Sequence, residues 1–178
     1  MLPRSVQDDF TISFWFKPEN KGKGKIGYQN WWSYSGLVDA EVAGALGDFG
    51  VTWGNGEVHF GIGFGYDTTI HSKAVAVNKW HHVAATRVKS TGQMQLYVDG
   101  ELVGVGKGVT SSLKASKTIT VGMLNTMLQD SYYNGWMADL QIWNRALPSH
   151  EVVTYKDECP DYLARGLVAS YVFSEKNP

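Results

Sequence analysis

The sequence predicts an all-β fold: a two-sheet antiparallel β-sandwich with one short helix near the C-terminus. The 178 residues include 20 Gly, seven Trp and nine Tyr but only five Pro, a composition that suits many short strands joined by tight turns. Apolar residues alternate along several segments, and the dipeptides Asn55-Gly56 and Asp99-Gly100 each mark a hairpin. Regularly spaced strands with one late helix are typical of a sandwich.

The individual elements follow from local patterns. In Phe10–Lys17 the alternate positions are all aromatic or aliphatic, which predicts a strand with one buried face, and Pro18 ends it. Pro148–Tyr155 is predicted to be the helix, with Pro148 in its first turn. Further strands are predicted at Leu37–Val42, Val51–Trp53, Val58–Ile62, Trp80–Arg87, Met94–Val98, Glu101–Val105, Thr118–Val121, Gly135–Trp143 and Gly166–Phe173. In Gly135–Trp143 we expect Met137, Asp139, Gln141 and Trp143 to share one face.

Length and charge exclude several classes of function. A chain of 178 residues fits one domain, so residues 1–178 are assigned to a single domain. The net charge of −1 provides no basic field for nucleic acid, and no apolar run reaches the about 18 residues that would span a membrane. Cys159 is the single cysteine, so no intramolecular disulfide forms. We expect a monomer with neither a nucleic-acid partner nor membrane insertion.

Four motifs in a fixed order carry a resemblance to a known family. FTISFWFKP, WHHVAATR, LYVDGELVG and YNGWMADLQIWNRALPSHEV follow one another between residues 10 and 152. In this order they resemble the laminin-G-like, concanavalin A-like lectin-glucanase jelly-roll domain of bacterial extracellular proteins. The resemblance implies two antiparallel sheets packed face to face and a secreted or cell-surface location. It also implies that the domain is one module of a multidomain protein and that this module binds glycan. Many members of the family hold a calcium ion.

The chain departs from the family at its N-terminus. Members usually begin with a strand of the type GLVAYYxF before the FTISFW strand, whereas only nine residues precede Phe10 here. A segment of that type, Gly166–Phe173, lies instead at the C-terminus. Because an open sheet edge is a liability, we hypothesise that this last strand fills the position of the missing first strand. The alternative is that the ends of this sequence do not coincide with the boundaries of the domain.

Four carboxylates are candidates for a calcium site. Asp39 and Glu41 are predicted on one face of a strand, about 7 Å apart, Asp48 follows shortly after, and Asp67 lies in a predicted loop. Calcium takes six to eight oxygen ligands, and the resemblance favours such an ion. We therefore nominate Asp39, Glu41 and Asp48 as metal ligands, structural or ligand-bridging. Ordinary solvated strand and turn residues are the alternative interpretation.

An aromatic cluster supplies the candidate carbohydrate site. The flat faces of Trp and Tyr stack on sugar rings while polar groups fix the hydroxyls. Tyr28–Tyr34 is rich in aromatic residues and lies close to the carboxylates in sequence. The nominated carbohydrate-binding residues are Trp31, Trp32, Tyr34, Tyr66 and Asp67. The alternative is core packing, although adjacent Trp31 and Trp32 cannot both point inward from an extended segment. Three further tryptophans are expected in the core: Trp15, Trp80 and Trp143.

Catalytic motifs are missing from the sequence. It contains no HExxH, no Gly-x-Ser-x-Gly and no Walker loop, and no Glu-x-Asp-x-Glu or Glu-x-Asp-x-x-Glu run of the kind found in active glucanases of the resembled family. We therefore expect a non-catalytic, calcium-stabilised carbohydrate-binding module of a larger secreted glycan-active enzyme or adhesin. The alternative is a structural spacer or protein-interaction domain of an extracellular protein.

Overall fold

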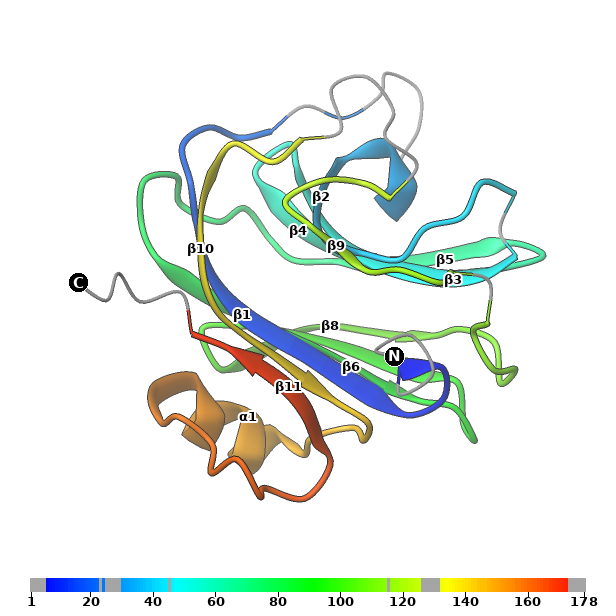
Figure 1. The fold of residues 1–178 in the computed structure, drawn as a ribbon. Coiled ribbons are helices and arrows are strands. Elements are labelled where there is room, and N and C mark those ends of the chain that lie inside the picture. The colour runs from blue at the N-terminus through cyan, green and yellow to red at the C-terminus, as the bar shows by residue number, and fades with distance from the viewer. Residues whose placement is uncertain are drawn as a thin grey trace.

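Two antiparallel sheets lie face to face in the computed structural model (Figure 1). It describes residues 6–22, 24, 30–44, 46–114, 116–125 and 132–172. One sheet has six strands in the order β11-β10-β1-β6-β7-β8, and the other has five in the order β5-β4-β3-β2-β9. The predicted all-β sandwich is confirmed. None of the described helices is long and apolar enough to cross a membrane.

The element bounds are as follows. The six-stranded sheet contains β1 (Phe10–Pro18), β6 (His81–Val88), β7 (Gln93–Val98), β8 (Glu101–Lys107), β10 (Gly135–Trp143) and β11 (Leu167–Tyr171). The five-stranded sheet contains β2 (Ser35–Asp39), β3 (Leu46–Gly54), β4 (Glu57–Phe64), β5 (Asp67–His71) and β9 (Thr120–Val121). A 3-10 turn, η2 (Trp31–Ser33), precedes β2, and the helix α1 (Ser149–Asp157) precedes β11.

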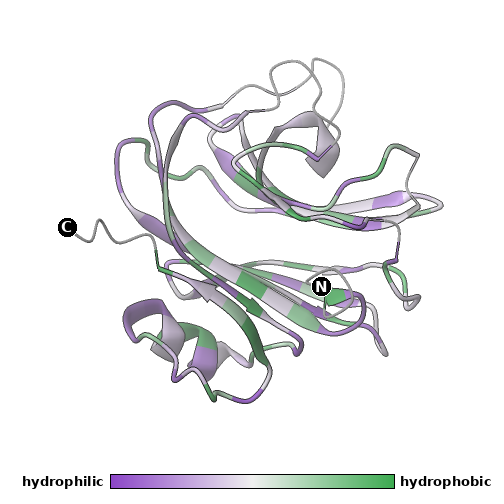
Figure 2. Cartoon of the chain, viewed as in Figure 1, coloured by the Kyte–Doolittle hydropathy of each residue, from purple (hydrophilic) through white to green (hydrophobic). Residues whose placement is uncertain are grey.

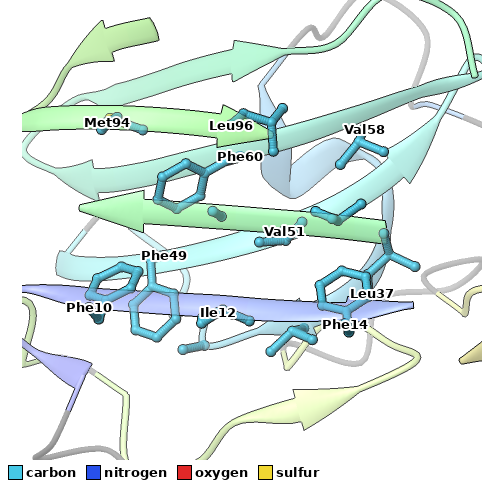
Figure 3. Close-up of a cluster of buried hydrophobic side chains, with 14 of the residues drawn as sticks. Phe10, Ile12, Phe14, Leu37, Phe49, Val51, Val58, Phe60, Met94 and Leu96 are labelled. Atoms are coloured by element: carbon cyan, nitrogen blue, oxygen red, sulfur yellow. The ribbon is translucent and has the colours of Figure 1, made fainter. Parts of the chain in front are cut away.

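The core lies between the sheets and is built from the inward-facing positions of each strand. Hydrophobic and hydrophilic residues alternate along the strands (Figure 2), as expected when one face of each sheet is buried. The alternate apolar residues of β1 are fully buried and meet β3 and β4 across the interface (Figure 3). The ring centroids of Phe10 and Phe49 lie 4.8 Å apart. Burial of these side chains removes a large apolar surface from water, which is the main stabilising contribution.

Both predicted hairpins are present with the expected turn geometry. Asn55 and Gly56 have φ values of 56° and 82°, and Asp99 and Gly100 have φ values of 53° and 86°. Two consecutive positive φ values define the type I′ turn, whose twist matches that of the flanking strands. The turns join β3 to β4 and β7 to β8.

A bulge in β10 overturns the predicted face of that strand. Asp139 adopts φ of 51° in mid-strand, where the pairing with β1 shifts by one residue. An extra residue in one strand reverses the alternation beyond it. Met137 therefore packs against the main core, whereas Gln141 faces the cavity beneath α1 and Trp143 belongs to a second apolar cluster there. The prediction that all four residues share one face was therefore wrong for Met137, whereas Asp139 and Gln141 line the same cavity on the outer face and Trp143 lies on that face too.

The helix covers the outer face of the six-stranded sheet, on the side away from β5 and β3 (Figure 1). Val152 is buried, and the indole of Trp143 stacks on the ring of Tyr155 at 4.8 Å between centroids. The predicted helix is confirmed at this place in the chain, but it runs from Ser149 to Asp157, and Pro148 is its N-cap instead of a residue of its first turn.

The last strand pairs antiparallel with β10 at the edge of the six-stranded sheet. A strand in this position covers the edge that β10 would otherwise expose, as the hypothesis of a displaced first strand requires. Phe173, the last residue of the predicted strand, lies outside the described residues.

Three predicted assignments need correction. Strand β2 ends at Asp39 instead of Val42, because the carboxylate of Asp39 accepts the backbone N–H of Glu41 at 3.0 Å and turns the chain. Glu41 therefore does not share a strand face with Asp39. Trp80 precedes β6 and is 45% exposed, so its assignment to the core was wrong. Asp67 starts β5, a strand that the sequence pattern had indicated as a loop.

Candidate functional site

The outer face of the five-stranded sheet has a floor of glycines. The inward positions of β3 and β4 hold core residues, so the alternate positions face outward. There Gly50 of β3 pairs with Gly61 of β4, and Gly63 of β4 lies between Asp48 and Asp67 in the same row. The floor therefore offers space for a ring and leaves carboxylates at its margin.

The chain fills this space with its own Trp31. The indole of Trp31 lies against Gly61 so closely that a Cβ added there would come within 1.8 Å of the ring. Turn η2 is fixed over the sheet by two hydrogen bonds: Trp31 N–H donates to Thr69 Oγ1 at 3.2 Å, and Thr52 Oγ1 donates to Trp31 O at 2.9 Å. Figure 1 shows η2 on the outer side of this sheet.

Two nominated aromatic residues are therefore not surface groups. Trp31 is 0% exposed and Tyr34 is 4% exposed. The Tyr34 ring stacks on the imidazole of His59 with 4.0 Å between centroids, and burial lowers the pKa of His59 to about 4. The expectation that Trp31 and Tyr34 stack on a sugar is incompatible with this burial, and we reassign both to packing on the sheet. Tyr28, from the same predicted cluster, lies outside the described residues.

Three other nominated residues form an accessible rim, which we call the Trp32 rim: Trp32, Tyr66 and Asp67. The indole Nε1–H of Trp32 donates to Asp67 Oδ2 at 2.7 Å. Tyr66 lies in the turn between β4 and β5 and is 61% exposed. The structure thus places a half-buried indole against the Asp67 carboxylate, and the exposed Tyr66 directly precedes Asp67 in the chain at the end of the β4–β5 hairpin.

The predicted metal ligands Asp39, Glu41 and Asp48 form an acidic cluster beside this rim. All three are buried. Asp39 Oδ2 accepts the backbone N–H groups of Glu41 at 3.0 Å and Asn125 at 2.8 Å, and Asp48 Oδ2 accepts that of Val42 at 2.8 Å. The second carboxylate oxygens of Asp39 and Asp48 have no hydrogen-bond partner among the described residues.

Burial shapes the electrostatics of the cluster. It raises the pKa of Asp39 to about 7, although two backbone N–H groups oppose the rise and the charges of Glu41 and Asp48 add to it. It raises the pKa of Asp48 to about 6, with further repulsion from Glu41 and Asp67. Carboxylates in such an environment hold a proton or need a cation.

The arrangement is not a complete metal site as it stands. Among the described residues, no three His, Cys, Asp or Glu side chains converge closely enough to enclose a metal ion. The unpaired oxygens of Asp39 and Asp48 nevertheless fit the hard oxygen ligands that calcium prefers.

One important member of the cluster could not be found from the sequence. Asn125 bonds to Asp39 through its backbone N–H and donates its side-chain Nδ2–H to the carbonyl of Glu41 at 3.1 Å. It is 86 residues from Asp39 in sequence, and no local pattern marks it. Only the packing of the segment after β9 beside β2 brings the two together.

Comparisons with known proteins agree with this architecture. The family model Laminin_G_3, described as the Concanavalin A-like lectin/glucanases superfamily, matches residues 2–153. A 99-residue stretch is 26% identical to the rat protein "Sushi, von Willebrand factor type A, EGF and pentraxin domain-containing protein 1", covering 52% of this chain. The chain spans only 3% of that relative's length.

Solved structures share the fold at low sequence identity. The native heptameric SAP-like pentraxin of Limulus polyphemus superposes with a TM-score of 0.65 at 19% identity, over 90% of this chain and 74% of the pentraxin. The CBM40 domain of the Ruminococcus gnavus IT-sialidase, solved with α2,3-sialyllactose, superposes with a TM-score of 0.64 at 15% identity, over 85% and 84% of the two chains.

Proposed function

The chain belongs to the concanavalin A-like lectin/glucanases superfamily, and we propose that it is a non-catalytic lectin-like domain that binds glycan at the Trp32 rim. The observation that carries this proposal is the hydrogen bond that fixes the Trp32 indole to the Asp67 carboxylate beside exposed Tyr66. Aromatic faces next to a fixed hydrogen-bond acceptor are the groups that bind a sugar ring.

The location of the rim follows from the buried Trp31. Because this indole occupies the glycine floor, a glycan meets the sheet at its margin, along the β4–β5 turn. The site is shallow and desolvates little surface, so we expect weak binding by a single copy. The sialyllactose in the R. gnavus CBM40 structure supports a sugar ligand for this fold. The very small share of the rat relative that the chain matches supports a module of a larger secreted or cell-surface protein.

Charge narrows the class of sugar. Asp67 lies at the rim, and Asp48 stands in the same row across Gly63. The charges of both carboxylates repel an acidic sugar, whereas Asp67 accepts hydrogen bonds from the hydroxyl groups of a neutral one. We therefore propose that neutral hexoses are favoured over sialylated glycans when no cation is bound.

We also propose calcium as a stabilising ion at the acidic cluster. Asp39 and Asp48 would supply the carboxylate oxygens that have no hydrogen-bond partner among the described residues, Glu41 would supply a third carboxylate, and rotation of these side chains would complete the site. A bound calcium ion would neutralise the mutual repulsion of the buried acids and hold β2 to β3 beside the rim.

A glycan array tests the sugar proposal with two variants of the rim and one control variant outside it. Trp32→Phe keeps an aromatic ring but removes the N–H that orients Asp67, and Tyr66→Ala removes the exposed ring. We expect either change to weaken binding by about tenfold, on the order of 1.4 kcal/mol. Trp80→Ala removes an exposed tryptophan from the segment before β6 of the other sheet and should leave binding unchanged. Glycan binding that survives both rim substitutions, or that is absent from the intact folded protein, contradicts the proposal.

Calcium has a separate measurement. A ligand that binds only the native state raises its stability, so the melting temperature should rise with millimolar calcium and fall with EGTA. Magnesium at the same concentration is the control, because it binds flexible carboxylate clusters poorly. Identical melting curves in calcium and EGTA would contradict the calcium proposal, whereas the proposal that glycan binds at the Trp32 rim would not be affected.

A protein-interaction domain is the second candidate. It is favoured by the exposed tryptophans Trp80 and Trp136, which lie outside the Trp32 rim and are 45% and 61% exposed, because exposed aromatic residues are enriched at protein interfaces. If Trp80→Ala and Trp136→Ala abolish capture by a partner domain while glycan binding is absent, this function replaces the first.

A further inference from the structure

A cavity of about 260 Å³ lies on the opposite side of the molecule from the Trp32 rim. It is enclosed between the outer face of the six-stranded sheet and the C-terminal end of α1, which Figure 1 shows beneath that sheet. Strands β1 and β6 contribute Trp15 and His82, and β10 contributes Asp139 and Gln141. The remaining wall consists of residues 155–159, Ser170 and Val172.

The floor of this cavity holds two buried polar groups. His82 is 2% exposed and Gln141 is 5% exposed. Neither His82 Nδ1 nor Gln141 Oε1 has a hydrogen-bond partner within the described part of the chain. A buried amide oxygen without a donor is unfavourable, so the floor favours an occupant that carries N–H or O–H groups.

Burial also keeps the imidazole of His82 uncharged. It lowers the pKa of His82 to about 4, with a further lowering from the nearby charge of Lys156. A neutral imidazole offers one ring nitrogen as an acceptor. At neutral pH the floor therefore adds no positive charge and can present two acceptors.

The mouth of the cavity is negatively charged. Among the residues that the structure describes, three acids line it, Asp139, Asp157 and Glu158, together with one cation, Lys156. The ammonium of Lys156 bonds to Asp157 at 2.7 Å and lies 5.8 Å from the centre of the Trp15 ring. The wall thus already holds one ammonium between a carboxylate and an indole face, an arrangement that attracts cations.

We propose that this cavity binds a small protonated primary amine. An ammonium group has three donors and no acceptor, which matches acceptors at the floor and carboxylates at the mouth. The volume falls below the about 300–1,000 Å³ of pockets for drug-sized ligands, so the occupant is a single small group. An amino sugar or a lysine side chain carries this chemistry equally well. Water alone is the competing occupant.

Calorimetric titration with matched pairs of probes tests the proposal. Glucosamine is compared with N-acetylglucosamine, and Nα-acetyl-lysine amide with its Nε-acetylated form, so each pair differs in one ammonium. We expect the amine of at least one pair to bind at least about tenfold more tightly than its acetylated partner. If the glucosamine pair shows the difference in affinity, the ligand is an amino sugar; if the lysine pair shows it, the ligand is a lysine side chain. Equal binding within both pairs, or no binding, means that the cavity holds water only and overturns the proposal.

Two variants locate the binding. Asp139→Asn removes one charge while retaining a residue type that tolerates positive φ, and Gln141→Leu removes the floor acceptor. Each should lower amine affinity several-fold, whereas Glu101→Gln, an exposed acid on β8, should not. Loss of affinity in the Glu101 variant alone would show unspecific charge attraction and would also overturn the proposal.

The single cysteine gives an independent readout. Cys159 lines the cavity and its thiol is free and exposed, so amine binding should slow its alkylation by iodoacetamide several-fold. The acetylated probe should leave the rate unchanged. If the alkylation rate of Cys159 is unchanged at a saturating concentration of the amine, the amine does not bind in this cavity. Trp32→Phe should not change amine binding, so failure here is distinguishable from failure of the glycan proposal.

Discussion

Replacement of Asp39 by Asn isolates the effect of burying a charge on the five-stranded sheet. The side chain of Asp39 is fully buried, and burial raises its pKa to about 7 from the ordinary 3.8. An Asn at this position can still accept the N–H groups of Glu41 and Asn125 through its oxygen, and it carries no charge. The variant therefore removes the charge while retaining the hydrogen bonds.

The sign and size of the effect follow from proton linkage. Because the native protein holds the Asp39 proton more tightly than the unfolded chain, this group's contribution is fully present below about pH 4 and is lost as pH rises through about 7. At about 1.4 kcal/mol per pH unit, the loss reaches about 4 kcal/mol. Without calcium at pH 8, Asp39→Asn should therefore be more stable than the unmodified protein by up to that amount, or about 8–16 °C in melting temperature.

Urea unfolding of both proteins in EGTA at pH 4, 6 and 8 measures this difference. Subtracting the two profiles cancels the contributions of other titrating groups that lie far from the substitution. The difference should be near zero at pH 4 and grow toward pH 8, while added calcium should stabilise only the unmodified protein. An Asn variant that is less stable at pH 8 in EGTA would refute the argument from burial.

Two further substitutions and one deletion test the fold and its supports. Gly61→Ala places a methyl group in the Trp31 indole, and we expect it to cost about 1–3 kcal/mol in urea unfolding; an unchanged stability would show that the ring can move aside freely. Arg87 is buried and its guanidinium donates to four backbone carbonyls, those of residues 7, 8, 109 and 111, so Arg87→Lys should cost about 3 kcal/mol and speed proteolysis of the N-terminal segment. Deletion of residues 166–178 uncovers β10 and should lower the melting temperature and promote aggregation at high concentration; unchanged melting would remove the role assigned to β11.

Local patterns in the sequence predicted the sandwich well. The alternation in Phe10–Lys17 and the two dipeptides Asn55-Gly56 and Asp99-Gly100 depend on neighbouring residues only, and the structure confirms all three. Their physical basis is short-range: side chains alternate across a strand, and two positive φ values fit Asn, Asp and Gly.

The features that the sequence did not predict depend on long-range contacts. The burial of Trp31 requires glycines on two strands that follow it by about 20 and 30 residues. The bulge at Asp139 shows no glycine in the sequence to mark it. Trp80 is exposed because α1 covers the sheet elsewhere. In each case the outcome depends on which segment packs against the residue, and a single sequence does not encode that in a readable local pattern.

The slot that holds Trp31 also has a consequence for the order in which the protein folds and opens. Gly50 and Gly61 belong to different strands, so the slot exists only after the β3–β4 hairpin has formed. Turn η2 is therefore expected to dock late in folding and to detach early, at a free energy below that of global unfolding. Amide hydrogen exchange should then be faster at Trp31 than in β3 beneath it, and each such opening would briefly uncover the glycine floor.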